Sequence, residues 1–190
     1  QCYKNSDGSV EITEQGKRLL IERARLVAGA VNKVALLREL MEQYKNDTHM
    51  LVYCGAARSN DFSSDESERD AEGERQIVSV SKMLGHDLGM KVTHFTSAES
   101  ASEREKIKYQ FANADPYQAI VAIKCLDEGV NIPSIKTAFI LASSTNPKEY
   151  IQRRGRVLRK APNKPHAVIF DFVILPTPLD CVCYGSENAR

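Results

Sequence analysis

The residues with the clearest capacity for chemistry are the arginines of residues 150–160. This stretch holds five cations, one glycine and no acid, and Arg153, Arg156 and Arg159 recur at every third position. On a helix, this spacing places the three side chains along one side, close enough together to bind a single anion. A guanidinium suits a phosphate chain because its planar fork donates two parallel hydrogen bonds. A solvated basic helix face and a plain nucleic-acid patch stay open as alternatives.

A second unusual segment lies upstream, at residues 119–133. It starts with five apolar residues, three of them β-branched, which predict a buried strand of a parallel sheet. A polar loop with Lys124, Gly129 and Asn131 follows and ends at Pro133. Ligands of open α/β sheets bind beyond the carboxyl ends of strands, so this loop and the loop before the arginines should share one edge. An ordinary connection stiffened by glycine and proline is the alternative.

Taken together, the two segments resemble motifs V and VI of superfamily 2 helicases, in the form of the excision-repair (XPB-type) and restriction-type members. Residues 126–133 correspond to motif V and residues 152–159 to motif VI. Residues 50–55 resemble motif IV, and residues 94–111 resemble the strand and helix that precede motif V. The resemblance covers residues 33–175, which is most of the chain.

The resemblance implies an α/β fold: a RecA-like domain of the P-loop NTPase type, with a mostly parallel central sheet and helices on both faces. The alternation of strand and helix patterns predicts the same sheet. We expect N-terminal helices in an extension at residues 1–32, the RecA-like domain at 33–175 and an irregular tail at 176–190. Residues 1–10 are expected to be frayed, and residues 57–75, with seven acids, to form a mobile loop.

Apolar periodicity gives the expected positions of the individual elements. Ser97 or Ser100 is a candidate cap for the helix that starts near residue 99, and Phe111 should point inward from that helix. The predicted helices are 11–46 with a break near Gly29, 74–88, 99–113 and the arginine helix; the predicted strands are 50–54, 91–95, 119–123, 137–141 and 167–172.

In the resembled family, ATP with Mg²⁺ binds in the cleft between two RecA-like domains. Motif VI supplies arginine fingers there, a catalytic role that the resemblance assigns to Arg156 and Arg159. Their guanidinium groups would neutralise charge on the γ-phosphate in the transition state. The resemblance implies four further nucleotide-binding residues, namely Gly129, Asn131, Gln152 and Arg153. Many relatives have Asp in place of Asn131, so the charge of that ribose contact is absent here.

The resemblance also implies a nucleic-acid track, with DNA as the expected partner and RNA as a possible one. Phosphate contacts would make binding independent of sequence and sensitive to salt. Many relatives have Thr in place of Ile123, and Lys124 is expected to compensate for the lost hydroxyl. A helix cap and a solvated loop residue are alternatives for the weaker candidates. The candidate nucleic-acid-binding residues are Lys124, Thr96, Ser97 and Arg58.

A complete ATPase site also needs a phosphate cradle, the Gly-x-x-x-x-Gly-Lys-Ser/Thr loop. This pattern does not occur in the sequence, and the acidic run 65–68 lies in a polar loop with no strand before it. We therefore expect an N-terminal RecA-like domain of the same polypeptide to hold ATP and Mg²⁺, and expect this chain alone not to hydrolyse ATP. A passive phosphate-binding or nucleic-acid-binding module, or a domain that docks a partner protein, remains an alternative.

The composition is that of an ordinary globular protein, with 42% apolar residues, 27% charged residues and a net charge of +1. The charge therefore gives no general attraction to nucleic acid, and any binding has to come from a local basic site. The five cysteines lack zinc-site spacing, so no metal site is expected, and the thiols should be reduced in a cytoplasmic protein. No apolar run is long enough to span a membrane.

Overall fold

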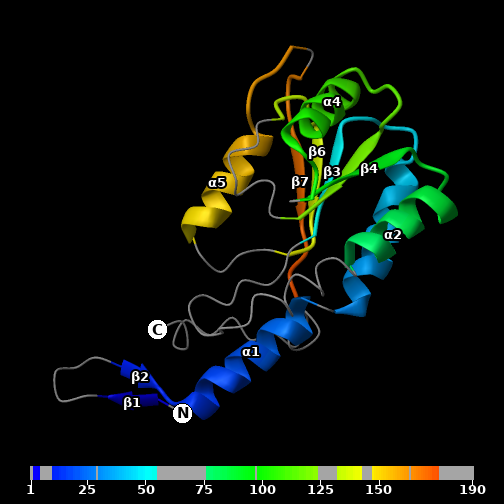
Figure 1. Ribbon diagram of the computed structural model, residues 1–190. Coiled ribbons are helices and arrows are strands. Elements are labelled where there is room, and N and C mark those ends of the chain that lie inside the picture. The colour runs from blue at the N-terminus through cyan, green and yellow to red at the C-terminus, as the bar shows by residue number, and fades with distance from the viewer. Residues whose placement is uncertain are drawn as a thin grey trace.

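A five-stranded parallel sheet lies at the centre of the molecule (Figure 1). The strand order is β4-β5-β3-β6-β7, and every neighbouring pair is parallel, as predicted. The strands are β3 (Met50–Tyr53), β4 (Val92–Phe95), β5 (Ala119–Ala122), β6 (Thr137–Ile140) and β7 (Val168–Asp171). This computed structural model describes residues 2–4, 10–28, 30–54, 76–96, 98–123, 132–142, 147–162 and 164–175.

The three central strands, β3, β5 and β6, are buried along their whole length. A strand covered on both faces tolerates only apolar side chains, which is why these segments appear as continuous apolar runs in the sequence. Tyr53 at the end of β3 pairs with Ala122 of β5 on one side and with Ile140 of β6 on the other. The carboxyl ends of the three strands therefore lie level at one edge, so the chain leaves β5 and β6 from the same edge, as predicted.

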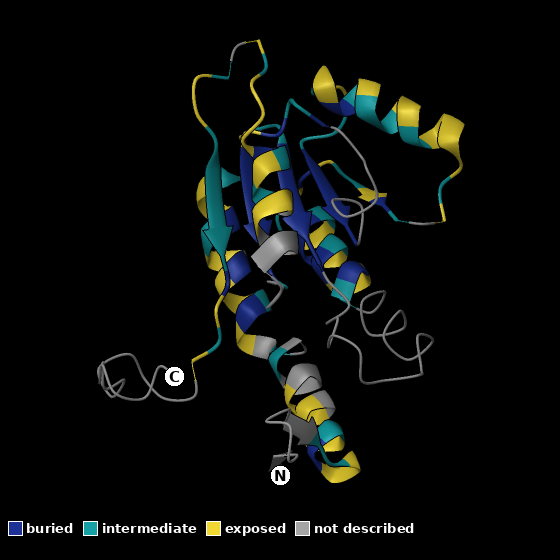
Figure 2. Ribbon diagram, turned by 90° about the vertical axis from the view of Figure 1, so that its left-hand side faces the viewer, coloured by how far each residue is buried: buried dark blue, intermediate teal, exposed yellow. Residues whose placement is uncertain are grey.

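Two apolar cores cover the two faces of the sheet. Successive side chains of a strand point to opposite faces, so Met50 and Val52 enter one core while Leu51 and Tyr53 enter the other. Leu37 of α2 lies in the first core, and α4 and α5 contribute to the second. Figure 2 shows the result, with helices that are buried toward the sheet and exposed on their outer sides.

Two helices precede the sheet, α1 (Glu14–Ala28) and α2 (Val31–Tyr44). The predicted break near Gly29 is confirmed because one helix ends and the other begins on either side of it. α1 extends away from the sheet, whereas α2 lies against it (Figure 1). Helix α2 packs firmly because Leu37 and Met41, one turn apart on the same side, are fully buried in the first core.

The prediction that residues 1–10 are frayed is wrong for residues 2–4 and 10, which belong to strands. Strand β1 (Cys2–Lys4) pairs antiparallel with β2 (Val10–Ile12). The intervening sequence Asn5-Ser6-Asp7-Gly8 consists of residue types that favour tight turns. The polar composition of this segment concealed the hairpin signal, because each strand is only three residues long.

The predicted helix at 74–88 is confirmed for the described part of the chain. Residues 76–82 are α-helical, and the last turn widens into a short π-helix, η1 (Met83–Asp87). Gly89 follows with a φ of 65°, a conformation that glycine adopts without steric strain. This glycine lets the chain turn at once into β4.

Helix α4 (Ala101–Ala112) begins at a capping box. The Ser100 hydroxyl accepts a hydrogen bond from the Glu103 amide at 3.3 Å, and the Glu103 carboxylate accepts one from the Ser100 amide at 2.8 Å. Both bonds satisfy backbone donors that the first turn leaves without a helical partner. Of the two predicted caps, Ser100 is therefore the one used. Phe111 is fully buried, as predicted.

Among the described residues, no helix combines the length and apolar character that a membrane-spanning segment needs.

Replacing Ser100 with Ala should lower the free energy of unfolding by about 1 kcal/mol, because the first turn of α4 loses its cap. Urea denaturation would measure the change. Ser102, also exposed and in the same turn, provides the matched control, and Ser102→Ala should change stability by less than about 0.5 kcal/mol. Equal losses in the two variants would contradict the role of Ser100 as the cap.

Candidate nucleotide-facing site

The arginine segment forms helix α5 (Pro147–Val157), which covers one face of the sheet beside β7 (Figure 1). The helix ends earlier than the predicted ridge requires. Arg156 lies in its last turn, but Arg159 lies beyond it, where the chain forms a turn with a weak 3.5 Å bond from its amide to the Arg156 carbonyl. The prediction that three arginines form one helical ridge is therefore wrong for Arg159.

The early end of α5 has a local cause. The carbonyls of Val157 and Arg159 accept hydrogen bonds from the side-chain ammonium of Lys164, at 2.6 and 2.9 Å. A basic side chain that binds the last carbonyls of a helix satisfies acceptors that otherwise lack a partner. Pro162 also opposes a longer helix, because it has no amide hydrogen to donate.

Arg154 holds the helix against the sheet. Its guanidinium donates a hydrogen bond to the carboxylate of Asp171, the last residue of β7. The two side chains are only 20% and 16% exposed, so water screens the ion pair weakly. Arg154 thus has a structural role that its place in the basic cluster did not indicate.

The residues near Arg154, in α5 and just after it, are more exposed to solvent. Gln152 and Arg159 are exposed, and Arg156 is partly buried. A Cβ atom added to Gly155 would meet no other atom within 4 Å, so the helix surface there is open. This side of α5 can therefore admit a ligand or a second domain without any rearrangement of the described residues.

A buried lysine lies at the edge of the sheet where β6 and β7 end. Lys33 of α2 is 4% exposed and donates a 2.7 Å hydrogen bond to the carbonyl of Leu141, the residue after β6. Burial lowers the pKa of Lys33, and the nearby negative charge of Asp171 partly opposes that change. The ends of β6 and β7 are thus both bound to cations, Lys33 at one and Arg154 at the other.

Thr96, a candidate for nucleic-acid contact, is engaged within its own loop. Its amide and its hydroxyl both donate to the carboxylate of Glu99, at 2.6 and 2.9 Å. Its carbonyl accepts a 2.9 Å hydrogen bond from Arg104, whose guanidinium lies 5.6 Å from the centre of the Phe95 ring. These contacts fix the turn between β4 and α4, which agrees with the local structural role that the sequence left open.

Several candidate residues lie outside the part of the chain that the structure describes. The same holds for the whole of the acidic segment 57–75 and for the tail 176–190. The candidates concerned are Lys124, Gly129, Asn131, Ser97, Arg58 and the side chain of Arg153. Their roles stay predictions.

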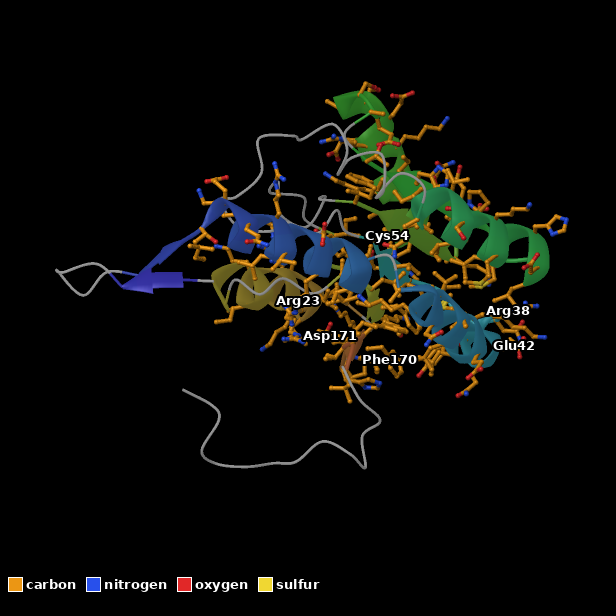
Figure 3. All side chains as sticks on the ribbon, turned by 90° about the horizontal axis from the view of Figure 1, so that it is seen from below. Arg23, Arg38, Glu42, Cys54, Phe170 and Asp171 are labelled. Atoms are coloured by element: carbon orange, nitrogen blue, oxygen red, sulfur yellow. The ribbon has the colours of Figure 1, made fainter. Side chains whose placement is uncertain are left out.

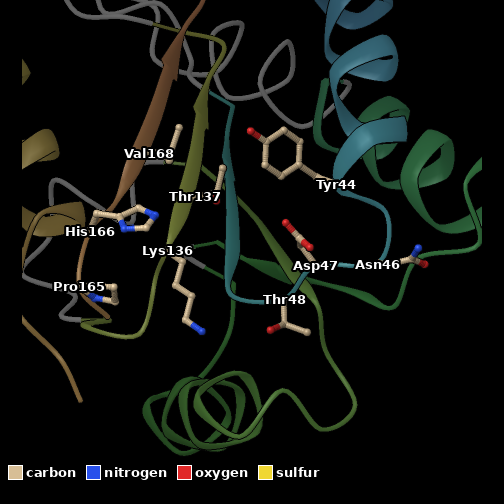
Figure 4. Close-up of a pocket in the computed structure, with 9 residues that line it drawn as sticks. All are labelled: Tyr44, Asn46, Asp47, Thr48, Lys136, Thr137, Pro165, His166 and Val168. Carbon is tan, nitrogen blue, oxygen red and sulfur yellow. The ribbon is translucent and has the colours of Figure 1, made fainter. Parts of the chain in front are cut away.

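A groove of about 570 Å³ lies at the opposite edge of the sheet (Figure 4). Thr137 and Val168, the first residues of β6 and β7, line it together with the exposed side chains of Asp47, Lys136 and His166. It is separate from the arginine helix. Within the described ranges, no group of three or more His, Cys, Asp or Glu side chains is placed to hold a metal ion.

The sequence comparison decides the family. Residues 32–161 match the model of the helicase conserved C-terminal domain. The chain belongs to this family. It is the C-terminal domain of a superfamily 2 helicase, as the motifs predicted.

Two curated relatives support the assignment. The chain is 28% identical over 139 residues to the DNA 3'-5' translocase XPB2 of Sulfurisphaera tokodaii, a match that covers 73% of the chain and 26% of the translocase. It is 26% identical over 82 residues to putative helicase 22 of a Sulfolobus islandicus filamentous virus, over 43% of the chain and 15% of that protein. The chain therefore spans about a quarter or less of the length of these relatives.

Solved structures show the same RecA-like helicase fold. The C-terminal part of the Fun30 ATPase domain superposes with a TM-score of 0.54 at 16% identity, over 73% of this chain and 39% of that one. The helicase MrfA, solved with DNA and AMPPNP, gives a TM-score of 0.52 at 18% identity, over 73% of this chain and 17% of that one. The predicted RecA-like fold is thus confirmed.

The Arg154→Met variant should lose about 2 kcal/mol of stability, because Asp171 keeps its weakly solvated charge without the guanidinium. Chemical denaturation would give the value. Lys160→Met removes another cation from the same basic segment, but Lys160 is exposed, so this control should shift stability by less than about 0.5 kcal/mol. A similar loss in both variants would mean that the ion pair does not anchor α5.

The lowered pKa of Lys33 predicts a specific pH dependence. Between that pKa and the ordinary value of 10.5, the unfolded chain binds more protons than the folded one, so stability rises with pH in this window. Lys33→Met removes the contribution. Urea unfolding from about pH 8 to about pH 10 should therefore show the wild-type stability increasing relative to that of the variant. A constant difference across that range would contradict burial of the ammonium.

Proposed function

We propose that this chain is the second motor domain of an ATP-dependent superfamily 2 DNA helicase or translocase. The observation that carries the proposal is the placement of motif VI: α5 is bound to β7 through Arg154, which leaves Arg156 and Arg159 at the end of the helix. The match to a DNA translocase of the XPB type favours DNA over RNA as the track.

The proposed reaction is ATP hydrolysis in a cleft between this domain and a first RecA-like domain of the same polypeptide. The first domain would hold the phosphates and Mg²⁺ of ATP. From this side, Arg156 and Arg159 would donate hydrogen bonds to the γ-phosphate as negative charge shifts in the transition state. Gln152, Arg153, Gly129 and Asn131 would position the nucleotide. Closure and opening of the cleft would then move the two domains along one DNA strand.

A helix that is fixed to the sheet suits the proposed role of its arginines in ATP hydrolysis. Two rigid attachments, the buried Val157 side chain and the Arg154–Asp171 ion pair, hold α5 on the sheet. The backbone that carries Arg156 is therefore in place before the transition state forms, which lowers the cost of positioning its guanidinium. Lys124, Ser97 and Arg58 would bind the DNA backbone, and we expect that binding to weaken with salt.

In a protein that contains both RecA-like domains, Arg156→Ala should lower kcat for ATP hydrolysis by about 10³-fold, with a much smaller change in nucleotide affinity. DNA-stimulated phosphate release would measure kcat. Arg38→Ala is the matched control because Arg38 is an exposed arginine of α2, and Figure 3 shows it well apart from Asp171. The control should keep wild-type turnover.

Near-normal turnover of Arg156→Ala would reject the finger assignment. If neither this chain nor the two-domain protein hydrolysed ATP, yet both bound phosphate or DNA at low salt, the chain would instead be a passive binding module. Hydrolysis by this chain alone would reject the two-domain mechanism.

A further inference from the structure

Lys164 joins two segments that are far apart in the sequence. Its ammonium donates to the carbonyls of Val157 and Arg159 at the end of α5, and also to the carbonyl of Pro133 at 3.0 Å. A lysine ammonium has three donors, so these bonds use its full capacity. Pro133 is the last residue of the segment 126–133 that resembles motif V.

The local chain explains how Lys164 reaches this place. Ala161 and Lys164 are joined by an isolated antiparallel β-bridge and by a 3.3 Å bond from the Lys164 amide to the Ala161 carbonyl, which brings these two positions together. Pro162 restricts the backbone between them. The chain reverses there, just after the arginines, so the Lys164 side chain points back to the helix end rather than into solvent.

Each of the three acceptors belongs to a residue with a proposed role or lies within two positions of one. One is the carbonyl of Arg159 itself, and Val157 directly follows Arg156. Pro133 lies two positions after Asn131. All three are backbone groups, so the contact fixes the course of the chain instead of pairing with a mobile side chain.

We propose that Lys164 is a positioning residue that holds the arginine end of motif VI and the exit of motif V in one fixed arrangement. The inference rests on the proposed function, since it concerns residues assigned there to ATP. Lys164 does not touch ATP in this mechanism. It acts through Arg156 and Arg159, whose donors must meet the γ-phosphate within a fraction of an ångström for full effect.

The test uses the protein with both RecA-like domains and compares Lys164→Met, Lys164→Arg and Lys106→Met. Lys106 is an exposed lysine of α4, so its variant controls for loss of one positive charge. Lys164→Met should lower kcat about 10- to 100-fold with little change in the KM for ATP, because a small displacement of the arginines suffices for that loss. Lys164→Arg should show a smaller decrease in kcat, since arginine keeps the positive charge but has a planar fork instead of three diverging donors. The control variant Lys106→Met should have the same kcat and KM for ATP as the wild type.

A double variant separates positioning from general stability. If Lys164 acts through Arg156, then Lys164→Met/Arg156→Ala should be no slower than Arg156→Ala alone. Hydrogen exchange gives a readout that does not depend on activity: the amides of Leu158 and Arg159, in the turn that Lys164 holds, should exchange about 10-fold faster in Lys164→Met.

The outcomes distinguish the two proposals. Wild-type kcat in Lys164→Met, with Arg156→Ala inactive, would overturn the positioning role and leave the finger assignment intact. Active Arg156→Ala would overturn the proposed function, while faster exchange at Leu158 and Arg159 would still establish the contact. If Lys164→Met does not fold, Lys164→Arg decides: a several-fold lower kcat at unchanged Tm supports positioning, and a wild-type kcat overturns it.

Discussion

The ion pair between Arg154 and Asp171 is the contact on which the placement of the arginine helix depends. It links the last turn of α5 to the carboxyl end of β7, through side chains that are largely shielded from water. Apolar packing alone would stabilise α5 on the sheet only weakly, because the helix has many cations and few apolar side chains. Val157 supplies the apolar contact, and Arg154 supplies the orientation. These two contacts set the position of α5 and therefore the backbone position of the other arginines that it carries.

The same edge of the sheet concentrates cations at the ends of strands. Lys33 binds the chain just after β6 and Arg154 binds the end of β7, whereas Lys164 lies toward the opposite edge, before β7, where it binds the carbonyls of Val157 and Pro133. Each cation is bound to a backbone carbonyl or to a carboxylate, which offsets part of the cost of removing its charge from water. Lys33 and Arg154 thereby bind the ends of β6 and β7 at this edge to the two helices that cover the sheet.

The different structural roles of the cations could not be predicted from their spacing in the sequence. A regular repeat of Arg153, Arg156 and Arg159 suggested one ridge, whereas the helix stops before Arg159. The reason is a local contact: the carbonyl of Val157, the last residue of α5, and the carbonyl of Arg159 just after it accept hydrogen bonds from Lys164. Arg154 likewise looked like one more surface cation, because its partner Asp171 belongs to a strand that comes 17 positions later.

The sequence by itself determined the family, the parallel sheet and the order of its elements. Continuous apolar runs must be covered on both faces, and motifs V and VI are specific in spacing and residue type. Only the tertiary structure decided which cations are anchors, where α5 ends and that Lys164 joins it to Pro133. Such contacts connect distant segments at atomic distances, and periodicity along a chain carries no information about which donor reaches which acceptor.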